Sequence, residues 1–480
     1  MRTTVAVVAS LLLLLCPLAA QAQDSSKAAL ESVAKSMGAD LVTSVVYVGS
    51  GVQYQPGQSK TPGMEWPKFG ARSYTRSINY DTGAMREDIV RTQAENPPRG
   101  GGVQPVRGEQ IQLFLVAADH AWNVVGDAAI PVPITLAERQ FQLWTTPHGI
   151  VKAALAGKGS MQGRTISVAV PGRFKAEALV NEQGLIDKVV GTIPSTVLGD
   201  MPMEVTYADY KDFGGVKFPT KIRQSAGGFP TLDLTVTDVQ PNMAFDVPVP
   251  AAVRQASNPY ARVTTQMVAD GVWYVTGGTH HSVVIEMKDH VIVVEGPLND
   301  DRAMAVIMEA RSLVPNKPIR YVVASHHHFD HSGGLRAFAS VNVTVIAHET
   351  ARAYLERALA APASVSPDRL TKSGRVSTVE GVRGKRVLSD GTRMVEIHEI
   401  VGPLHADDLL MVYLPKEKLL IEADVYTPLA PNVTPPTPPS PFTVAFDDHL
   451  SKLGLAVDQL LPLHGRIVPF AEMKKTIGRQ

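Results

Sequence analysis

The sequence is nearly devoid of cysteine, because Cys16 is the single cysteine among its 480 residues. An intramolecular disulfide is therefore excluded, and a chain of this length buries a core without one. An excess of charge of either sign is missing too, since 46 Lys and Arg face 46 Asp and Glu. That balance argues against a nucleic-acid-binding surface, which needs a basic excess. Hydrophobic residues at 44% and charged residues at 19% exclude a largely disordered chain.

Long apolar runs are missing except at the N-terminus. There Arg2 precedes an apolar run at residues 5–15, and residues 20–22 have the small-x-small pattern of a signal-peptidase site. The run is shorter than the ~20 residues that a membrane anchor needs. We therefore predict a signal peptide at residues 1–22, no transmembrane segment, and a periplasmic or secreted protein. Cleavage there removes Cys16, so that the mature chain has no cysteine.

Most of the first half of the chain has the pattern of β-strands, with β-branched and aromatic residues between Gly, Pro, Asn and Asp. We predict one helix at residues 26–37, a second near residues 136–144, and a Pro- and Gly-rich loop at residues 96–108. The clearest predicted strands are residues 41–48, 73–80, 165–170, 203–207 and 232–239.

A β-hairpin is indicated at residues 210–219, which read Tyr-x-x-Phe-Gly-Gly-Val-x-Phe-Pro. With one helix followed by strands, this half resembles the curved half-barrel of bacterial lipoprotein carriers. The resemblance implies an envelope or lipid-like ligand, and a generic β-rich accessory domain is the alternative. A Pro-rich and polar stretch from Val247 to Tyr260 predicts a linker. We therefore expect a β-rich domain at residues 23–255 and a second domain at residues 256–480.

The second half has a different pattern, in which strands alternate with helices. Strands are predicted at residues 271–275, 282–286 and 291–295, and a helix capped by Asp301 follows them. A buried strand at residues 321–324 then leads into a cluster of histidines. This alternation predicts a layered α/β domain.

The cluster contains the motif H-x-H-x-D-H, formed by His326, His328, Asp330 and His331. Residues two apart in an extended segment face the same side, so His326 and His328 can converge on one metal ion. Asp330 and His331, at the turn that follows, can converge on a second ion. Imidazole and carboxylate donors suit zinc. His327 points the other way in this interpretation and is not a predicted ligand.

At this motif the sequence resembles the metallo-β-lactamase superfamily, whose αββα sandwich holds one or two metal ions between its sheets. The resemblance implies three further ligands, His405, Asp424 and His464, each next to a predicted strand. It implies two Zn²⁺ ions per chain and a bridging hydroxide as nucleophile. The implied ligands of the first ion are His326, His328 and His405, those of the second are Asp330, His331 and His464, and Asp424 bridges the ions.

A bridging aspartate resembles the lactonase, glyoxalase II and phosphodiesterase branches of that superfamily. Together with the predicted export and the neutral charge, it favours a hydrolase of small-molecule esters, lactones or amides, β-lactams included. Two alternatives remain open. One is an iron-dependent thiol or persulfide oxygenase on the same ligands, and the other is an envelope lipid-binding protein with a subsidiary metal domain.

Several further residues are predicted near the site. Asp330 and Tyr426 are the predicted catalytic residues, with Tyr426 either bonding a substrate oxygen or packing as a strand-end tyrosine. His280 and His281 either touch the substrate or support the ligands. The Pro-rich segment at residues 428–441 is either a rim or lid of the site or a plain connection. The histidines without a motif are read as structural: His120, His148, His290, His348, His398 and His449.

Overall fold

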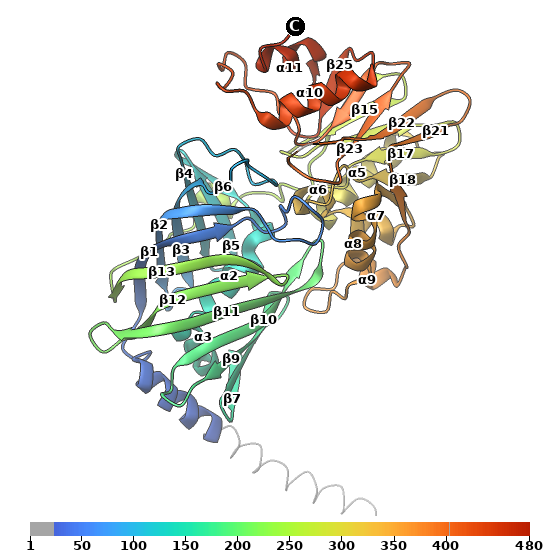
Figure 1. The fold of residues 1–480 in the computed structure, drawn as a ribbon. Coiled ribbons are helices and arrows are strands. Elements are labelled where there is room, and N and C mark those ends of the chain that lie inside the picture. The colour runs from blue at the N-terminus through green and yellow to red at the C-terminus, as the bar shows by residue number, and fades with distance from the viewer. Residues whose placement is uncertain (1–23, 403) are drawn as a thin grey trace, which may run out of the picture.

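The computed structural model describes residues 24–402 and 404–480 (Figure 1). The predicted signal peptide at residues 1–22 lies outside the described residues and stays a prediction. Within the described ranges, no helix is long and apolar enough to cross a membrane.

The N-terminal half is built on one antiparallel sheet of thirteen strands among the described residues. Two meanders, β1 to β6 and β7 to β13, are joined where β1 pairs with β13. The strands are β1 (Ser44–Tyr54), β2 (Lys68–Asn79), β3 (Ala84–Gln93), β4 (Glu109–Ala117), β5 (His120–Val125), β6 (Ala128–Pro131), β7 (Gly159–Gln162), β8 (Thr165–Val170), β9 (Phe174–Val180), β10 (Ile186–Ser195), β11 (Gly199–Asp212), β12 (Lys217–Ala226) and β13 (Phe229–Pro241).

Side-chain alternation gives this sheet one buried face. Along β9, Phe174, Ala176, Ala178 and Val180 are buried and the residues between them are exposed. The sheet curves around α2 (Leu136–Trp144) and α3 (Pro147–Ala153), as Figure 1 shows. The predicted β-rich domain is thereby confirmed, whereas its likeness to a lipoprotein carrier stays a prediction.

The local predictions in this half mostly hold. The helix predicted at residues 26–37 spans residues 24–37 and buries Leu30, Val33 and Met37 against the sheet. The predicted hairpin joins β11 to β12. The strand predicted at residues 41–48 instead begins at Ser44 and extends to Tyr54.

The C-terminal half contains two sheets packed face to face. The first runs β14 to β20 in sequence order, and the second runs β21 to β26. Their strands are β14 (Thr264–Ala269), β15 (Val272–Thr276), β16 (Ser282–Glu286), β17 (Val291–Val294), β18 (Ile319–Val323), β19 (Thr344–His348), β20 (Val379–Val382), β21 (Lys385–Ser389), β22 (Met394–Glu399), β23 (Leu410–Leu414), β24 (Leu419–Glu422), β25 (Gln459–Pro462) and β26 (Val468–Pro469).

Three apolar clusters hold these layers together. One lies between the sheets and joins residues such as Val283 and Ile285 to Val412 and Ile421. The others pack helices against the outer faces of the first and second sheet. The helices are α5 (Asp300–Leu313), α6 (Phe329–Ser332), α7 (Leu335–Ser340), α8 (Glu349–Ala360) and α9 (Arg369–Ser373) on the first sheet, and α10 (Pro441–Leu453) and α11 (Phe470–Thr476) on the second. The predicted αββα sandwich is therefore present.

One predicted cap is wrong. Helix α5 begins at Asp300, and the side chain of Asn299 caps it by accepting a hydrogen bond from the backbone N–H of Arg302 at 2.9 Å. Asp301 lies inside the first turn, where its negative charge suits the helix dipole.

Part of the predicted linker packs against the N-terminal half. Val247 and Val253, the latter in the short helix α4 (Ala251–Arg254), pack against Leu115 and Trp122 of the N-terminal sheet. The segment is therefore anchored to that sheet, and the division at residue 255 stays a prediction.

Candidate metal centre

The predicted ligands lie in loops and in the short helix α6, between strands of the two sheets. His326 to His331 follow β18, Asp424 follows β24 and His464 follows β25. Backbone hydrogen bonds hold these loops together: His281 donates to the carbonyl of Leu463 at 2.9 Å. Asp424 has a φ of 64°, in the left-handed region that non-glycine residues rarely adopt. Such backbone strain is typical of functional sites.

The first group consists of His326, His328, His405 and Asp424, whose donor atoms lie within 4.8 Å of one another. Nε2 of His405 is 3.3 Å from Nε2 of His326 and 3.0 Å from Oδ2 of Asp424. Four ligands with bonds near 2.05 Å around a tetrahedral zinc ion stand about 3.3 Å apart. The spacing of these atoms therefore fits one metal ion.

The second group consists of His280, Asp330, His331 and His464. Nε2 of His464 is 3.0 Å from Nε2 of His331, and Nε2 of His280 is 3.1 Å from Oδ2 of Asp330. Asp424 also reaches this group, because its Oδ1 lies 3.0 Å from Nε2 of His464. One carboxylate thus places an oxygen beside each group, as the predicted bridging role requires.

Outer hydrogen bonds set which ring nitrogen of each histidine is free. Nδ1–H of His464 donates to the carbonyl of Thr279 at 3.0 Å, which leaves Nε2 for a metal. Nε2–H of His328 donates to the carbonyl of Ser59 at 2.8 Å. Nδ1 of His328 is then a buried lone pair that finds no hydrogen-bond partner among the described residues. A metal ion bound to this nitrogen would use its lone pair.

Glu295 is connected by hydrogen bonds to one histidine of each group. Its Oε2 accepts from Oγ of Ser325 at 2.5 Å and from Nδ1–H of His331 at 3.3 Å. Oγ of Ser325 in turn accepts from Nδ1–H of His326 at 3.0 Å. One buried carboxylate therefore orients a histidine of each group, directly or through a hydroxyl.

The pKa values fit a site built for cations. Burial and the neighbouring imidazoles hold the pKa values of His326 and His328 well below the usual value, so both rings are neutral donors. Burial disfavours ionisation of Asp424, but the imidazoles of His331, His464 and His405 outweigh it and lower its pKa. Burial alone would lower the pKa of His331. The negative charges of Asp424 and Asp330 outweigh burial, so the pKa of His331 is raised. The carboxylates thus attract positive charge to this point.

Comparison with known proteins identifies the C-terminal half. The family model described as the metallo-beta-lactamase superfamily matches residues 275–471, the stretch that holds every candidate ligand. Residues 275–471 are a metallo-β-lactamase superfamily domain. The predicted fold class and family of this half are confirmed.

Individual relatives of this chain are distant. The 2,4-dinitroanisole O-demethylase subunit alpha of Nocardioides sp. (strain JS1661) is 27% identical over 176 residues. That match covers 36% of this chain and about half (49%) of the relative. Among solved structures, a metallo-β-lactamase from Pontibacter korlensis is 16% identical, with 45% of this chain and 97% of that chain covered and a TM-score of 0.35. The metallo-β-lactamase from Hirschia baltica is 20% identical, with 45% and 96% covered and a TM-score of 0.34.

The β1–β2 loop, residues 55–67, brings the N-terminal half into contact with the metallo-β-lactamase domain. Nε2 of Gln58 donates to Oδ1 of Asp330 at 2.7 Å. Oε1 of Gln58 accepts from the backbone N–H of Gly102, in the predicted Pro- and Gly-rich loop, at 3.0 Å. Lys60 forms an ion pair with Asp407, next to the first group. Two predicted ligands, Asp330 and His328, therefore each bond a residue of the other half of the chain.

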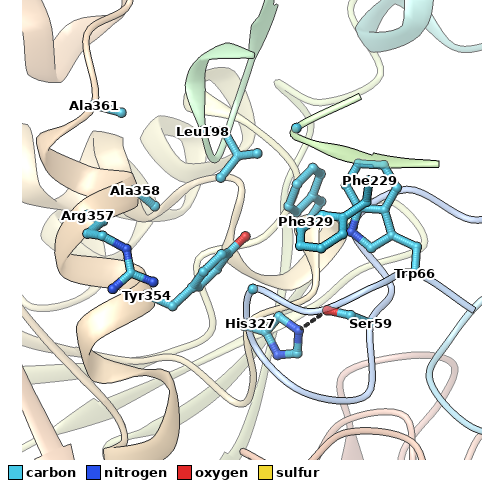
Figure 2. Close-up of a pocket in the computed structure, with 13 residues that line it drawn as sticks. Ser59, Trp66, Leu198, Phe229, His327, Phe329, Tyr354, Arg357, Ala358 and Ala361 are labelled. Atoms are coloured by element: carbon cyan, nitrogen blue, oxygen red, sulfur yellow. Dashed lines mark hydrogen bonds between the residues drawn. The ribbon is translucent and has the colours of Figure 1, made fainter. Parts of the chain in front are cut away.

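An aromatic contact and a cavity lie beside this loop (Figure 2). Phe329, inside the histidine motif, packs edge-on against Trp66 of the β1–β2 loop, with ring centroids 6.4 Å apart. The cavity beside them has a volume of about 250 Å³. His327 faces it and bonds Oγ of Ser59 at 2.9 Å, while its Nδ1 bonds Asp408 at 2.7 Å. His327 thus lies outside both groups, as the sequence predicts.

Tyr426 does not face the metal groups. Its side chain is buried among Phe446, Leu450 and Met473 of the cluster under α10 and α11. Burial, followed by the negative charge of Glu472 in α11, raises its pKa to about 12. The positive φ of Asp424 turns the chain at this point, so the side-chain alternation of β24 does not continue to Tyr426. Its predicted contact with substrate is corrected to packing.

The remaining predicted residues divide. His280 joins the second group, whereas His281 packs against Tyr274, with ring centroids 5.1 Å apart. The Pro-rich segment has no regular secondary structure before Pro441, its last residue, where α10 begins. Arg107 donates to the carbonyls of Thr437 at 3.0 Å and of Pro438. These hydrogen bonds tie the segment to the N-terminal half, and its predicted role as a rim or lid stays a prediction.

Proposed function

We propose that this chain is an exported, zinc-dependent hydrolase with two metal ions, acting on esters, lactones or amides. The observation that carries the proposal is the position of Asp424. Its two carboxylate oxygens each lie 3.0 Å from a histidine nitrogen of a different group. Five imidazoles and two carboxylates form a donor set suited to zinc.

The residues have separate roles in this proposal. His326, His328 and His405 would hold one ion, and Asp330, His331 and His464 the other, with Asp424 between them. When bound, zinc ions supply an acidified water and polarise a carbonyl oxygen. Glu295, Ser59 and Thr279 keep the ring nitrogens of the ligands in the tautomers that bind metal. The mature chain offers no cysteine nucleophile if residues 1–22 are removed.

The experiment combines metal analysis with a substrate panel. The panel contains p-nitrophenyl acetate, dihydrocoumarin and nitrocefin as ester, lactone and β-lactam. 4-Nitroanisole is added because a relative is named as an O-demethylase. We expect turnover of a panel member, loss on chelation, and a fall of at least about 100-fold in His326→Ala, more than removal of an outer partner costs.

A matched variant controls for damage to the fold. His290 lies at the opposite end of β17 from Glu295 and bonds Asp289, so His290→Ala should keep full activity. Full activity in His326→Ala contradicts the hydrolase. Purified protein that holds iron and consumes oxygen with a thiol or persulfide favours the oxygenase alternative instead. The lipid-like ligand of the N-terminal half stays a proposal, tested by analysis of lipids that copurify with the full chain.

A further inference from the structure

A second cavity lies in the N-terminal half and reaches the metal centre. It has a volume of about 470 Å³, within the ~300–1,000 Å³ typical of small-molecule sites. Its lining includes Asp330, Leu298 and Phe329 of the metallo-β-lactamase domain together with side chains of β1, β10, β13 and α2. We call it the sheet cavity. It connects the concave side of the N-terminal sheet to a predicted metal ligand.

The walls of the sheet cavity are mixed in character. Met85, Ile89 and Ile193 are apolar and buried, with at most 2% of each residue exposed. Gln53 and Gln142 add side-chain amides. Oε1 of Gln53 is buried and accepts no hydrogen bond from the described residues. A buried acceptor without a donor is costly, so this oxygen suits a ligand that carries an N–H or O–H group.

The charges that line the sheet cavity are already used. Arg76 and Glu87 form a buried ion pair, and the hydroxyl of Tyr74 donates to Oε2 of the same carboxylate. Arg139 donates to the backbone carbonyls of neighbouring strands. Glu138 accepts a hydrogen bond from Nε2 of Gln142 at 3.3 Å, and burial raises the pKa of its carboxyl, which favours the uncharged form. A charged ligand group would be desolvated there without a free counter-ion, at a large cost.

We propose that the sheet cavity binds an uncharged, largely apolar part of the substrate, with a hydrogen-bond donor directed at Gln53. The reacting carbonyl of that substrate lies at the Asp330 end. This inference deepens the proposed function and rests on it for the reaction. The N-terminal sheet is then a substrate-binding element.

Binding is tested with N-phenyl-1-naphthylamine, an uncharged aromatic probe with one N–H donor whose fluorescence rises in apolar surroundings. We expect one molecule to bind per chain. Thr231→Trp, which fills the cavity from β13, should weaken binding at least 10-fold. Val190→Trp adds the same side chain on β10 at a residue that is 40% exposed, and it should leave the affinity within twofold of wild type.

A second variant changes chemistry instead of volume. Gln53→Leu keeps the size of the side chain and removes the unpaired acceptor. It should weaken the N–H probe about threefold to tenfold, the effect of one hydrogen bond. It should leave binding of 1-benzylnaphthalene, which has CH₂ in place of N–H, unchanged. Equal losses for both probes, or none for either, contradict the assignment of Gln53.

Hydrolysis gives an independent readout. Wild type should prefer p-nitrophenyl octanoate to p-nitrophenyl acetate in kcat/KM. Thr231→Trp should abolish this preference by raising KM for the octanoate alone. If both esters and the probe respond alike in Thr231→Trp and Val190→Trp, the sheet cavity is not the binding site. If neither these esters nor any member of the substrate panel is hydrolysed but probe binding follows the expected pattern, the hydrolase proposal fails and the binding site stands.

Discussion

The two halves of this chain contribute to one candidate metal centre in different ways. The metallo-β-lactamase domain supplies donor side chains, most of them in or near a motif that is visible in the sequence. The N-terminal half supplies the amide of Gln58, the backbone carbonyl of Ser59 and the sheet cavity. Donor chemistry is thus carried by residue type, whereas donor orientation and substrate space arise from packing between distant segments.

The largest effect should come from the carboxylate that both metal groups share. Asp424→Ala should reduce turnover to the uncatalysed rate and remove both zinc ions, because each group loses a ligand. Asp458→Ala, which removes an exposed carboxylate paired with Lys418, is the control and should keep zinc and activity. Retention of two zinc ions by Asp424→Ala contradicts the bridging role.

The next effect concerns the N-terminal half alone. Glu87→Ala leaves the buried guanidinium of Arg76 without its partner and should lower the free energy of unfolding by about 3–5 kcal/mol. Urea unfolding followed by tryptophan fluorescence measures this, since three of the four tryptophans lie in this half. Glu182→Ala removes a side chain that is 85% exposed and should have no measurable effect. Equal stability of the two variants would show that the buried pair is dispensable.

The stability of the N-terminal half should also depend on pH through a histidine that lies outside the candidate metal centre. Burial lowers the pKa of His148 to about 4, although the carbonyl of Met37 favours the proton. The unfolded chain has a pKa near 6.5 at this residue. Between these values only the unfolded state binds the proton, so the stability falls as the pH decreases from about 6.5 to about 4.

The expected loss from His148 is about 3 kcal/mol in all. It should be absent from His148→Leu and unaffected by chelators. The measurement is urea unfolding of both proteins at pH 7 and pH 4.5. A wild-type loss no larger than that of the variant would assign the acid sensitivity to other groups.

The smallest effect tests the contact between the halves. Gln58→Leu removes the hydrogen bond to Asp330 and should weaken the second zinc ion about 10-fold, at the low end for outer partners. Competition with a chromogenic chelator measures this affinity. Gln240→Leu, which removes an amide that bonds only Asp238 among the described residues, is the control. An unchanged zinc affinity in Gln58→Leu would show that the hydrogen bond from Gln58 to Asp330 does not contribute to zinc binding.

The sequence indicates which residues offer metal donors because that chemistry depends on side-chain identity and position, and their role as ligands stays a prediction. Asp424 and His464 closely follow β24 and β25, His405 lies in the connection between β22 and β23, and the structure gathers all three around the motif. His280 was left open between two roles, because nothing in the sequence shows that the loop before β16 folds over Asp330.

The outer partners were not predictable in the same way. Ser59 acts through its backbone carbonyl, which every residue possesses, so no side-chain pattern could reveal it. Glu295 offered a signal, since it is an acidic residue at the end of an apolar strand. Of the two interpretations of Tyr426, the structure favours packing over contact with substrate. The sequence did not show this, because the turn at Asp424, with its positive φ, changes the face on which later side chains lie.

The most direct test of the account is the metal content of the purified chain and of one variant. Inductively coupled plasma mass spectrometry should find two zinc ions per wild-type chain. His464→Ala removes a ligand of the second group only and should hold one. A single metal ion per wild-type chain, with the same content in His464→Ala, would contradict a centre of two ions joined by Asp424.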